Sequence, residues 1–155
     1  MSKITDTPDA SASRQSAYQV AGTITKGRMA REAPLAAAAL EAVEASDVVV
    51  VTGCYDHVEQ VLDALDVPYR TIEPGHLDTL MLRPEQVLVV NCPGEVSPAA
   101  IVRIRDFVAA GGTLFTTDWA LRHVVEPAFP GFVAYNDRAT GDDVVRIEVV
   151  DADSP

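Results

Sequence analysis

The sequence has little of several residue types, and each shortage excludes a class of protein. Two cysteines in 155 residues are too few for a disulfide scaffold, so we expect reduced thiols in a cytoplasmic protein. Lys and Arg number 12 against 23 Asp and Glu, a net charge of -11. Without a basic patch, this charge predicts no nucleic-acid partner. No apolar run approaches the roughly 20 residues of a membrane helix, and residues 1–16 lack the apolar stretch of a secretory signal.

The chain divides into two parts by composition. Residues 1–30 are rich in Ser, Thr, Asp and Ala without a sustained period, which predicts a mobile polar tail, with residues 18–20 as a candidate short edge strand. Residues 31–155 carry most of the apolar residues, and hydrophobic residues make up 48% of the chain. That share predicts a single packed domain.

Strand and helix patterns alternate through the second part. Strands are predicted at 47–53, 69–72, 87–91, 113–117 and 144–150, and helices at 35–45, 57–65, 98–110 and 120–125. The first and third strands are continuous apolar blocks, as in a sheet covered on both faces, whereas the last alternates and suits an edge. The alternation predicts a three-layer α/β/α flavodoxin-like sandwich with a mainly parallel sheet of five or slightly more strands.

A binding site in such a sheet is expected beyond the carboxyl ends of the strands. The loops at 53–57, 91–95 and 116–119 follow three strands that we expect to be neighbours. Their candidate ligand-binding residues are Cys54, Tyr55, Asp56, Asn91, Cys92, Gly94, Glu95, Asp118 and Trp119. Asp56 also suits the N-cap of the following helix, and each cysteine also suits a small buried apolar position.

The sequence predicts neither a cofactor nor a metal. The glycine patterns that bind phosphates in dinucleotide and nucleotide sites are absent. Cys54, Cys92 and His57 with a carboxylate contain zinc-binding groups, but their spacing matches no paired-ligand motif. His76 is expected on a surface turn, and His123 in a structural role.

A family resemblance arises from the second half of the chain. Residues 87–97 form a strand followed by a Pro-Gly loop, 107–112 end a helix as F-V-A-A-G-G, and 113–120 form a strand with a sharp turn. This pattern resembles the class I glutamine amidotransferase-like superfamily, closest to the trehalose-utilisation-protein-like branch, over residues 47–121. The resemblance implies a flavodoxin-like fold and a pocket at the turn.

The sequence departs from that family at the catalytic positions. The turn that carries the nucleophilic cysteine in active amidotransferases carries Asp118 here, followed by the bulky Trp119. No histidine follows His123, although the family's base lies well downstream. The resemblance therefore implies a non-catalytic module rather than glutamine hydrolysis. The end at Pro155 suits a longer parent protein or a partner that supplies the remainder.

Three functions remain open. In the first, the module binds a small ligand or a protein partner, with Asp118 as a hydrogen-bond acceptor, Trp119 as a stacking surface and the backbone near Gly94 as an anion donor. In the second, Asp118 is the nucleophile of a hydrolase, since Asp-Trp after a strand also resembles the elbow of haloalkane-dehalogenase-like enzymes.

The third function is that of a cysteine-dependent or redox enzyme. Cys54 or Cys92 would then be the reactive thiol, with Asp56, His57 or Glu95 nearby.

Two further expectations concern partners. The apolar residues at 35–43 offer a face for a homodimer. The acidic composition makes basic groups the favoured charged partners, and we expect no membrane partner.

Overall fold

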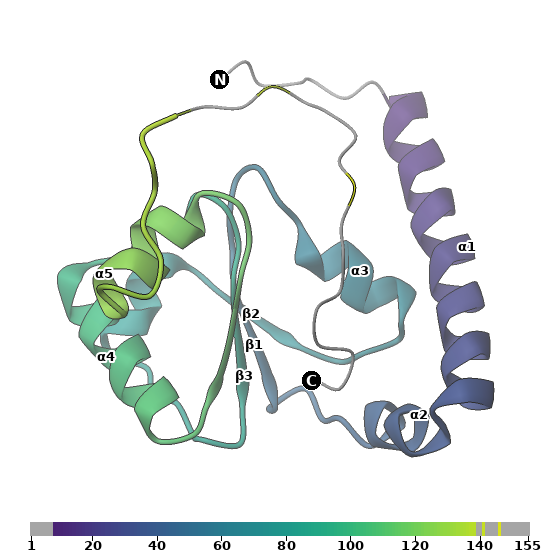
Figure 1. Ribbon diagram of the computed structural model, residues 1–155. Coiled ribbons are helices and arrows are strands. Elements are labelled where there is room, and N and C mark those ends of the chain that lie inside the picture. Colours follow the sequence, from purple (N-terminus) through teal and green to yellow (C-terminus); the bar gives the residue numbers. More distant parts are fainter. Residues whose placement is uncertain (1–7, 139–140, 142–145, 147–155) are drawn as a thin grey trace.

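The centre of the molecule is a parallel sheet (Figure 1). The computed structural model describes residues 8–138 together with Gly141 and Arg146. Its strands are β1 (Val48–Val51), β2 (Arg70–Ile72), β3 (Val87–Val90) and β4 (Thr113–Thr116), in the order β2-β1-β3-β4. Every adjacent pair is parallel, so all four carboxyl ends lie at the same edge of the sheet.

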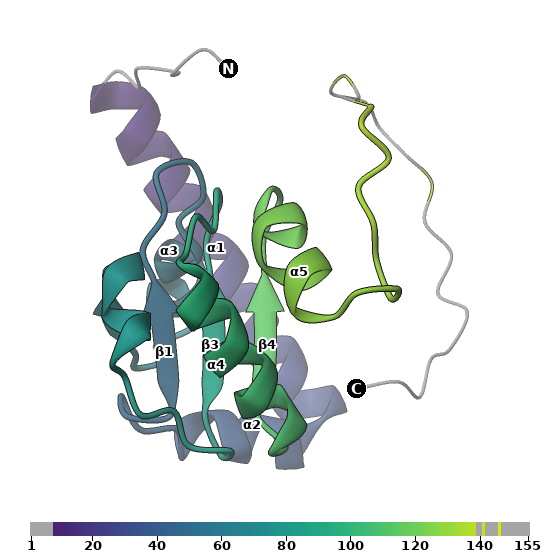
Figure 2. The same ribbon diagram turned by 90° about the vertical axis from the view of Figure 1, so that its left-hand side faces the viewer.

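Helices cover both faces of the sheet (Figures 1 and 2). One side carries α1 (Pro8–Glu32), α2 (Pro34–Glu41) and α3 (Val58–Ala64). The other carries the 3-10 helix η1 (Pro74–Asp78), α4 (Pro98–Ala109), the π-helix η2 (Leu121–Val125) and α5 (Glu126–Ala128). The α/β class with a parallel sheet is thus confirmed. No helix in the described part of the chain is both long enough and apolar enough to cross a membrane.

The sheet has four strands over the described residues, not the predicted five. The strand predicted at 144–150 falls outside the described residues except for Arg146, which is exposed and belongs to no strand.

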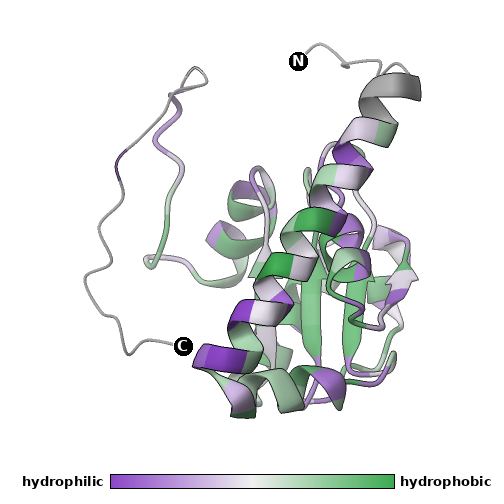
Figure 3. Cartoon of the chain, turned by 90° about the vertical axis from the view of Figure 1, so that its right-hand side faces the viewer, coloured by the Kyte–Doolittle hydropathy of each residue, from purple (hydrophilic) through white to green (hydrophobic). Residues whose placement is uncertain are grey.

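Two apolar clusters, one on each face, hold the layers together. Val49 and Val51 of β1 pack with Ile104 and Phe107 of α4, and the alternate residues of β1 pack against α2 and α3. All of β1 is buried, as expected of a strand covered on both faces. Figure 3 shows these apolar strands behind the helices of the α1 side.

Helix α4 begins where the sequence predicts. Ser97 is its N-cap, and the Ser97 hydroxyl accepts a hydrogen bond from the Ala100 N–H at 3.0 Å. Pro98 occupies the first turn, where no N–H is needed. The helix ends before Gly111, whose φ of 104° suits glycine.

Where the sequence predicted a mobile polar tail over residues 1–30, the structure instead has the helix α1 from Pro8 to Glu32. The strand proposed at 18–20 is wrong as well. The helix has no apolar stripe, and its line of contact with the domain runs along α3 and α2. At that line Gly22 is buried against Ala64, and Lys26 pairs with Asp66.

Two helix ends also differ from the prediction. Helix α2 ends at Glu41 rather than at residue 45, because the Glu44 N–H donates to Asp47 Oδ2 in the turn that leads into β1. The helix predicted to stop before Pro127 continues as α5, with Pro127 in the first turn of α5.

Candidate functional site

Three turns meet at the carboxyl edge of the sheet. The Cys54 N–H donates to the Cys92 carbonyl at 3.0 Å, and the Cys92 N–H donates to Thr117 Oγ1 at 3.0 Å. A Cβ atom at Gly53 would lie 2.2 Å from the Cys92 carbonyl oxygen, so only glycine permits this approach. The three loops expected to be neighbours are therefore in direct contact.

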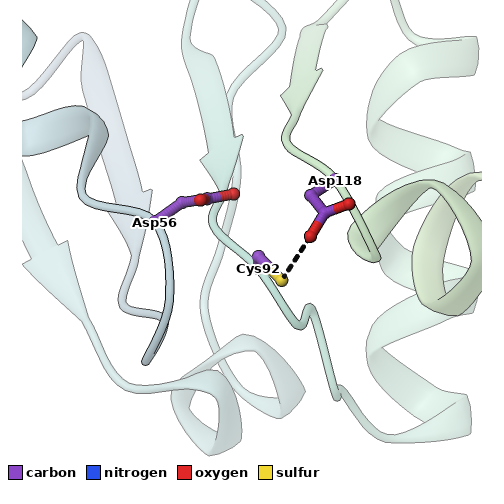
Figure 4. Close-up of side chains that lie close together, drawn as sticks. All are labelled: Asp56, Cys92 and Asp118. Atoms are coloured by element: carbon purple, nitrogen blue, oxygen red, sulfur yellow. Dashed lines mark hydrogen bonds between the residues drawn. The ribbon is translucent and has the colours of Figure 1, made fainter. Parts of the chain in front are cut away.

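Side chains from each of the three turns converge on one point (Figure 4). A carboxylate oxygen of Asp56, the sulfur of Cys92 and a carboxylate oxygen of Asp118 lie within 4.8 Å of one another. Asp56 follows β1 and Cys92 follows β3, the two strands between which the chain order reverses. That reversal point is where open α/β sheets bind ligands.

Cys92 is a buried thiol. Its side chain donates to Asp118 Oδ2 with a sulfur–oxygen distance of 3.4 Å. Burial raises the pKa of Cys92 from 9.0 to about 11; the Trp119 backbone N–H opposes this rise, and the hydrogen bond and charge of Asp118 and the charge of Asp56 add to it. The thiol is therefore protonated near neutral pH, which argues against Cys92 as a nucleophile.

Asp118 stands in an unusual backbone conformation. Its φ is 41°, in the left-handed region, directly after β4. Aspartate tolerates this region better than most residues, at a cost of about 1 kcal/mol or more. Its carboxylate is exposed and turned towards Cys92.

Asp56 is not the helix cap that the sequence suggested. Helix α3 begins at Val58 with His57 as N-cap and no side-chain cap bond from it. The buried Asn91 takes over part of this role, because Asn91 Oδ1 accepts from the Val58 N–H at 3.4 Å. Its amide group also donates to Glu59 Oε2 at 2.8 Å. Asn91 is thus occupied in structure, and Asp56 is left to face the cluster.

The remaining predicted residues lie around the cluster without joining it. Cys54, Tyr55 and Glu95 are exposed. Gly94 is buried, and a Cβ atom there would lie 2.6 Å from the Cβ of Ala120, so Gly94 serves close packing. The ring of Trp119 lies against Tyr135, with centroids 5.3 Å apart.

Four residues next to the site were given no part in it by sequence reasoning. Thr117 holds the Cys92 backbone. Arg122 and Tyr135 contact the Trp119 ring. His123, expected to be structural, donates from Nδ1 to the Pro93 carbonyl at 2.7 Å. Only the spacing of Trp119, Arg122 and His123 within one helical turn hinted at this group.

Asp56, Cys92 and Asp118 each offer one atom that could ligate a metal ion. Zinc binds carboxylates and thiolates, so Cys92 would have to lose its thiol proton before it could join such a site. The cluster includes neither Cys54 nor His57, so the zinc set considered from the sequence is not the one that the described residues assemble.

Comparisons with known proteins add no relative to this description. No family model, curated protein or solved structure matches the chain.

Proposed function

We propose that this chain is a non-catalytic ligand-binding module that resembles the class I glutamine amidotransferases. Its site is the carboxyl edge of the sheet around Asp56, Cys92 and Asp118. The ligand is a small molecule with an ammonium or guanidinium group. The convergence of two carboxylates at the reversal point of the strand order carries this proposal.

The fold and the turn support the family resemblance. The order β2-β1-β3-β4 is the beginning of the flavodoxin-like order, in which a fifth strand would follow β4. The left-handed backbone of Asp118 after β4 is the kind of strained turn that presents a nucleophile in related architectures. A carboxylate in that position is still held out from the turn, but it cannot carry out the chemistry of a cysteine thiol.

The charge of the cluster favours a cationic ligand. Asp56 and Asp118 lie together without a basic side chain in the cluster. Among the described residues, neither carboxylate forms an ion pair. A cation between them gains from both charges, whereas a phosphate or carboxylate ligand is repelled.

Titration followed by backbone NMR tests the proposal. Putrescine, agmatine, sodium acetate and inorganic phosphate are added separately to the full chain. We expect putrescine or agmatine to shift the amide signals of residues 54–57, 92, 94 and 117–119 with saturation, while both anions leave them unchanged.

Three variants decide whether the cluster of Asp56, Cys92 and Asp118 binds the amine. Asp56→Asn and Asp118→Asn retain the side-chain shape but remove the charge, and we expect each to weaken binding at least about tenfold, the loss of one close charge pair. Glu95→Gln removes an exposed carboxylate that lies in the Cys92 loop but outside the cluster, and is expected to leave binding unchanged. Equal losses in all three variants, or saturable binding of phosphate, would contradict the proposal.

The Asp118 nucleophile is the second candidate, since its carboxylate is exposed at the turn. Mass spectrometry after incubation with alkyl halides tests it, because attack of the Asp118 carboxylate on the halide-bearing carbon forms an alkyl ester and releases the halide ion. A stoichiometric ester on Asp118 would replace the binding proposal, because a carboxylate nucleophile forms such an adduct.

A further inference from the structure

A segment without regular secondary structure lies next to the Asp118 turn. We call residues 129–138 the strap. Figure 2 shows that the strap begins at the end of α5 and runs beside that helix, on the side away from the sheet. Most strap residues are exposed, and Phe132 exposes 87% of its surface. Such a segment has few contacts that oppose local opening.

One aromatic residue anchors the strap. The half-buried Tyr135 packs on the Trp119 ring at 5.3 Å between centroids. The Arg122 guanidinium contacts both rings, at 5.7 Å from the Trp119 centroid and 4.9 Å from the Tyr135 centroid. A guanidinium nitrogen of Arg122 also lies 3.8 Å from Asp137 Oδ1. The Tyr135 backbone N–H donates a hydrogen bond to Glu126 Oε2 at 3.3 Å.

The residue held by this anchor belongs to the site. Trp119 directly follows Asp118, whose carboxylate accepts a hydrogen bond from the Cys92 thiol. The turn thus contacts Cys92 through two groups: the Thr117 hydroxyl accepts a hydrogen bond from the Cys92 backbone N–H, and the Asp118 carboxylate accepts one from the Cys92 thiol. A strained turn persists only while its surroundings hold it.

We propose that the strap is a latch, in which Tyr135 holds the Asp118 turn closed over the Cys92 thiol. When Tyr135 leaves Trp119, the turn loses its outer support and the thiol becomes accessible without global unfolding. The latch would regulate access to the proposed ligand site, and that part of the inference rests on the proposed function. The latch itself involves only residues of this chain.

Thiol labelling measures the opening. Cys54→Ser leaves Cys92 as the only cysteine of the chain. In that background, N-ethylmaleimide labels Cys92 at a rate set by opening. We expect Tyr135→Ala to raise the rate about tenfold or more, as expected when a ring pair and a cation–π contact are both lost.

Two matched variants separate the latch from general damage. Tyr135→Phe retains the ring and is expected to label at the parent rate. Phe132→Ala removes an exposed ring from the same strap without touching Trp119, and is also expected to match the parent. Trp119 is the only tryptophan, so its emission should shift to the red and become easier to quench in Tyr135→Ala alone.

The urea dependence decides between local and global opening. A local latch gives labelling that is nearly independent of low urea concentrations, whereas global unfolding gives a steep dependence. Unchanged labelling in Tyr135→Ala, or a rise that only follows its lower global stability, overturns the inference. Since no ligand is present, failure of amine binding would refute the proposed function and leave the latch result standing.

Discussion

At the scale of single residues, Cys92 and Asp118 depend on each other. A glycine would adopt the φ of 41° without strain, but aspartate needs compensation from its surroundings. Cys92 provides part of this compensation. Its thiol donates a hydrogen bond to the Asp118 carboxylate, and its backbone N–H donates one to Thr117 Oγ1. The thiol is therefore part of the support of the turn, and its proton is essential to that role.

The stability of the protein should consequently fall in mild alkali. The folded state raises the pKa of Cys92 from 9.0 to about 11, so it binds the proton more tightly than the unfolded chain does. This contribution is complete below pH 9 and is lost as the pH rises towards 11. We expect the unfolding free energy to decrease by about 1 kcal/mol between pH 8 and pH 10 from this group.

Urea unfolding of the parent and of Cys92→Ala at both pH values checks this expectation. The variant should be less stable at pH 8 but should lack this part of the decrease. Burial and the bond to Asp63 raise the pKa of Tyr69 to about 12, so the loss from Tyr69 comes mainly above pH 10. The same decrease in both proteins would contradict the assignment to Cys92.

At the scale of elements, the position of α1 depends on a glycine. Gly22 is buried, and a Cβ atom there would lie 2.1 Å from the Ala64 carbonyl oxygen of α3. The absence of a side chain brings the two helix backbones together. Val20 and Ile24, which flank this contact, expose 58% and 66% of their surfaces, so apolar burial adds little to the docking of α1.

Gly22→Ala should therefore destabilise the protein by about 1–3 kcal/mol, because backbone atoms must move to admit the methyl group. Gly27→Ala is the matched control in the same helix, since its nearest contact would be the flexible Arg31 side chain at 3.6 Å. The control should gain up to about 1 kcal/mol from helix propensity. Urea unfolding measures both, and equal changes would refute the close-approach argument.

At the scale of the whole molecule, the face expected to mediate a homodimer is only partly available. Leu40 and Val43 pack against the core beside β1. Leu35 remains outside with 87% of its surface exposed, among exposed alanines of α2. Any pairing through α2 therefore centres on Leu35 and works against a net charge of -11 on each copy.

Pairing through this face predicts a dimer that becomes more populated with rising salt, because salt screens the repulsion between acidic copies. Sedimentation velocity at increasing protein and sodium chloride concentrations measures the population. Leu35→Glu should abolish the dimer, and Met81→Glu is a control at a distant, 82%-exposed apolar residue. A monomer under all conditions would end the homodimer prediction.

The sequence by itself determined the strand blocks, the cap of α4 and the three loops at one edge of the sheet. These follow from local patterns, such as the buried valines of β1 and the Ser97-Pro98 start, and from the rule that parallel strands end together. Only the tertiary structure decided that α1 is a docked helix, that Asn91 replaces Asp56 at the start of α3, and that Tyr135 covers Trp119. Each of these depends on contacts between residues distant in sequence, which no local period encodes.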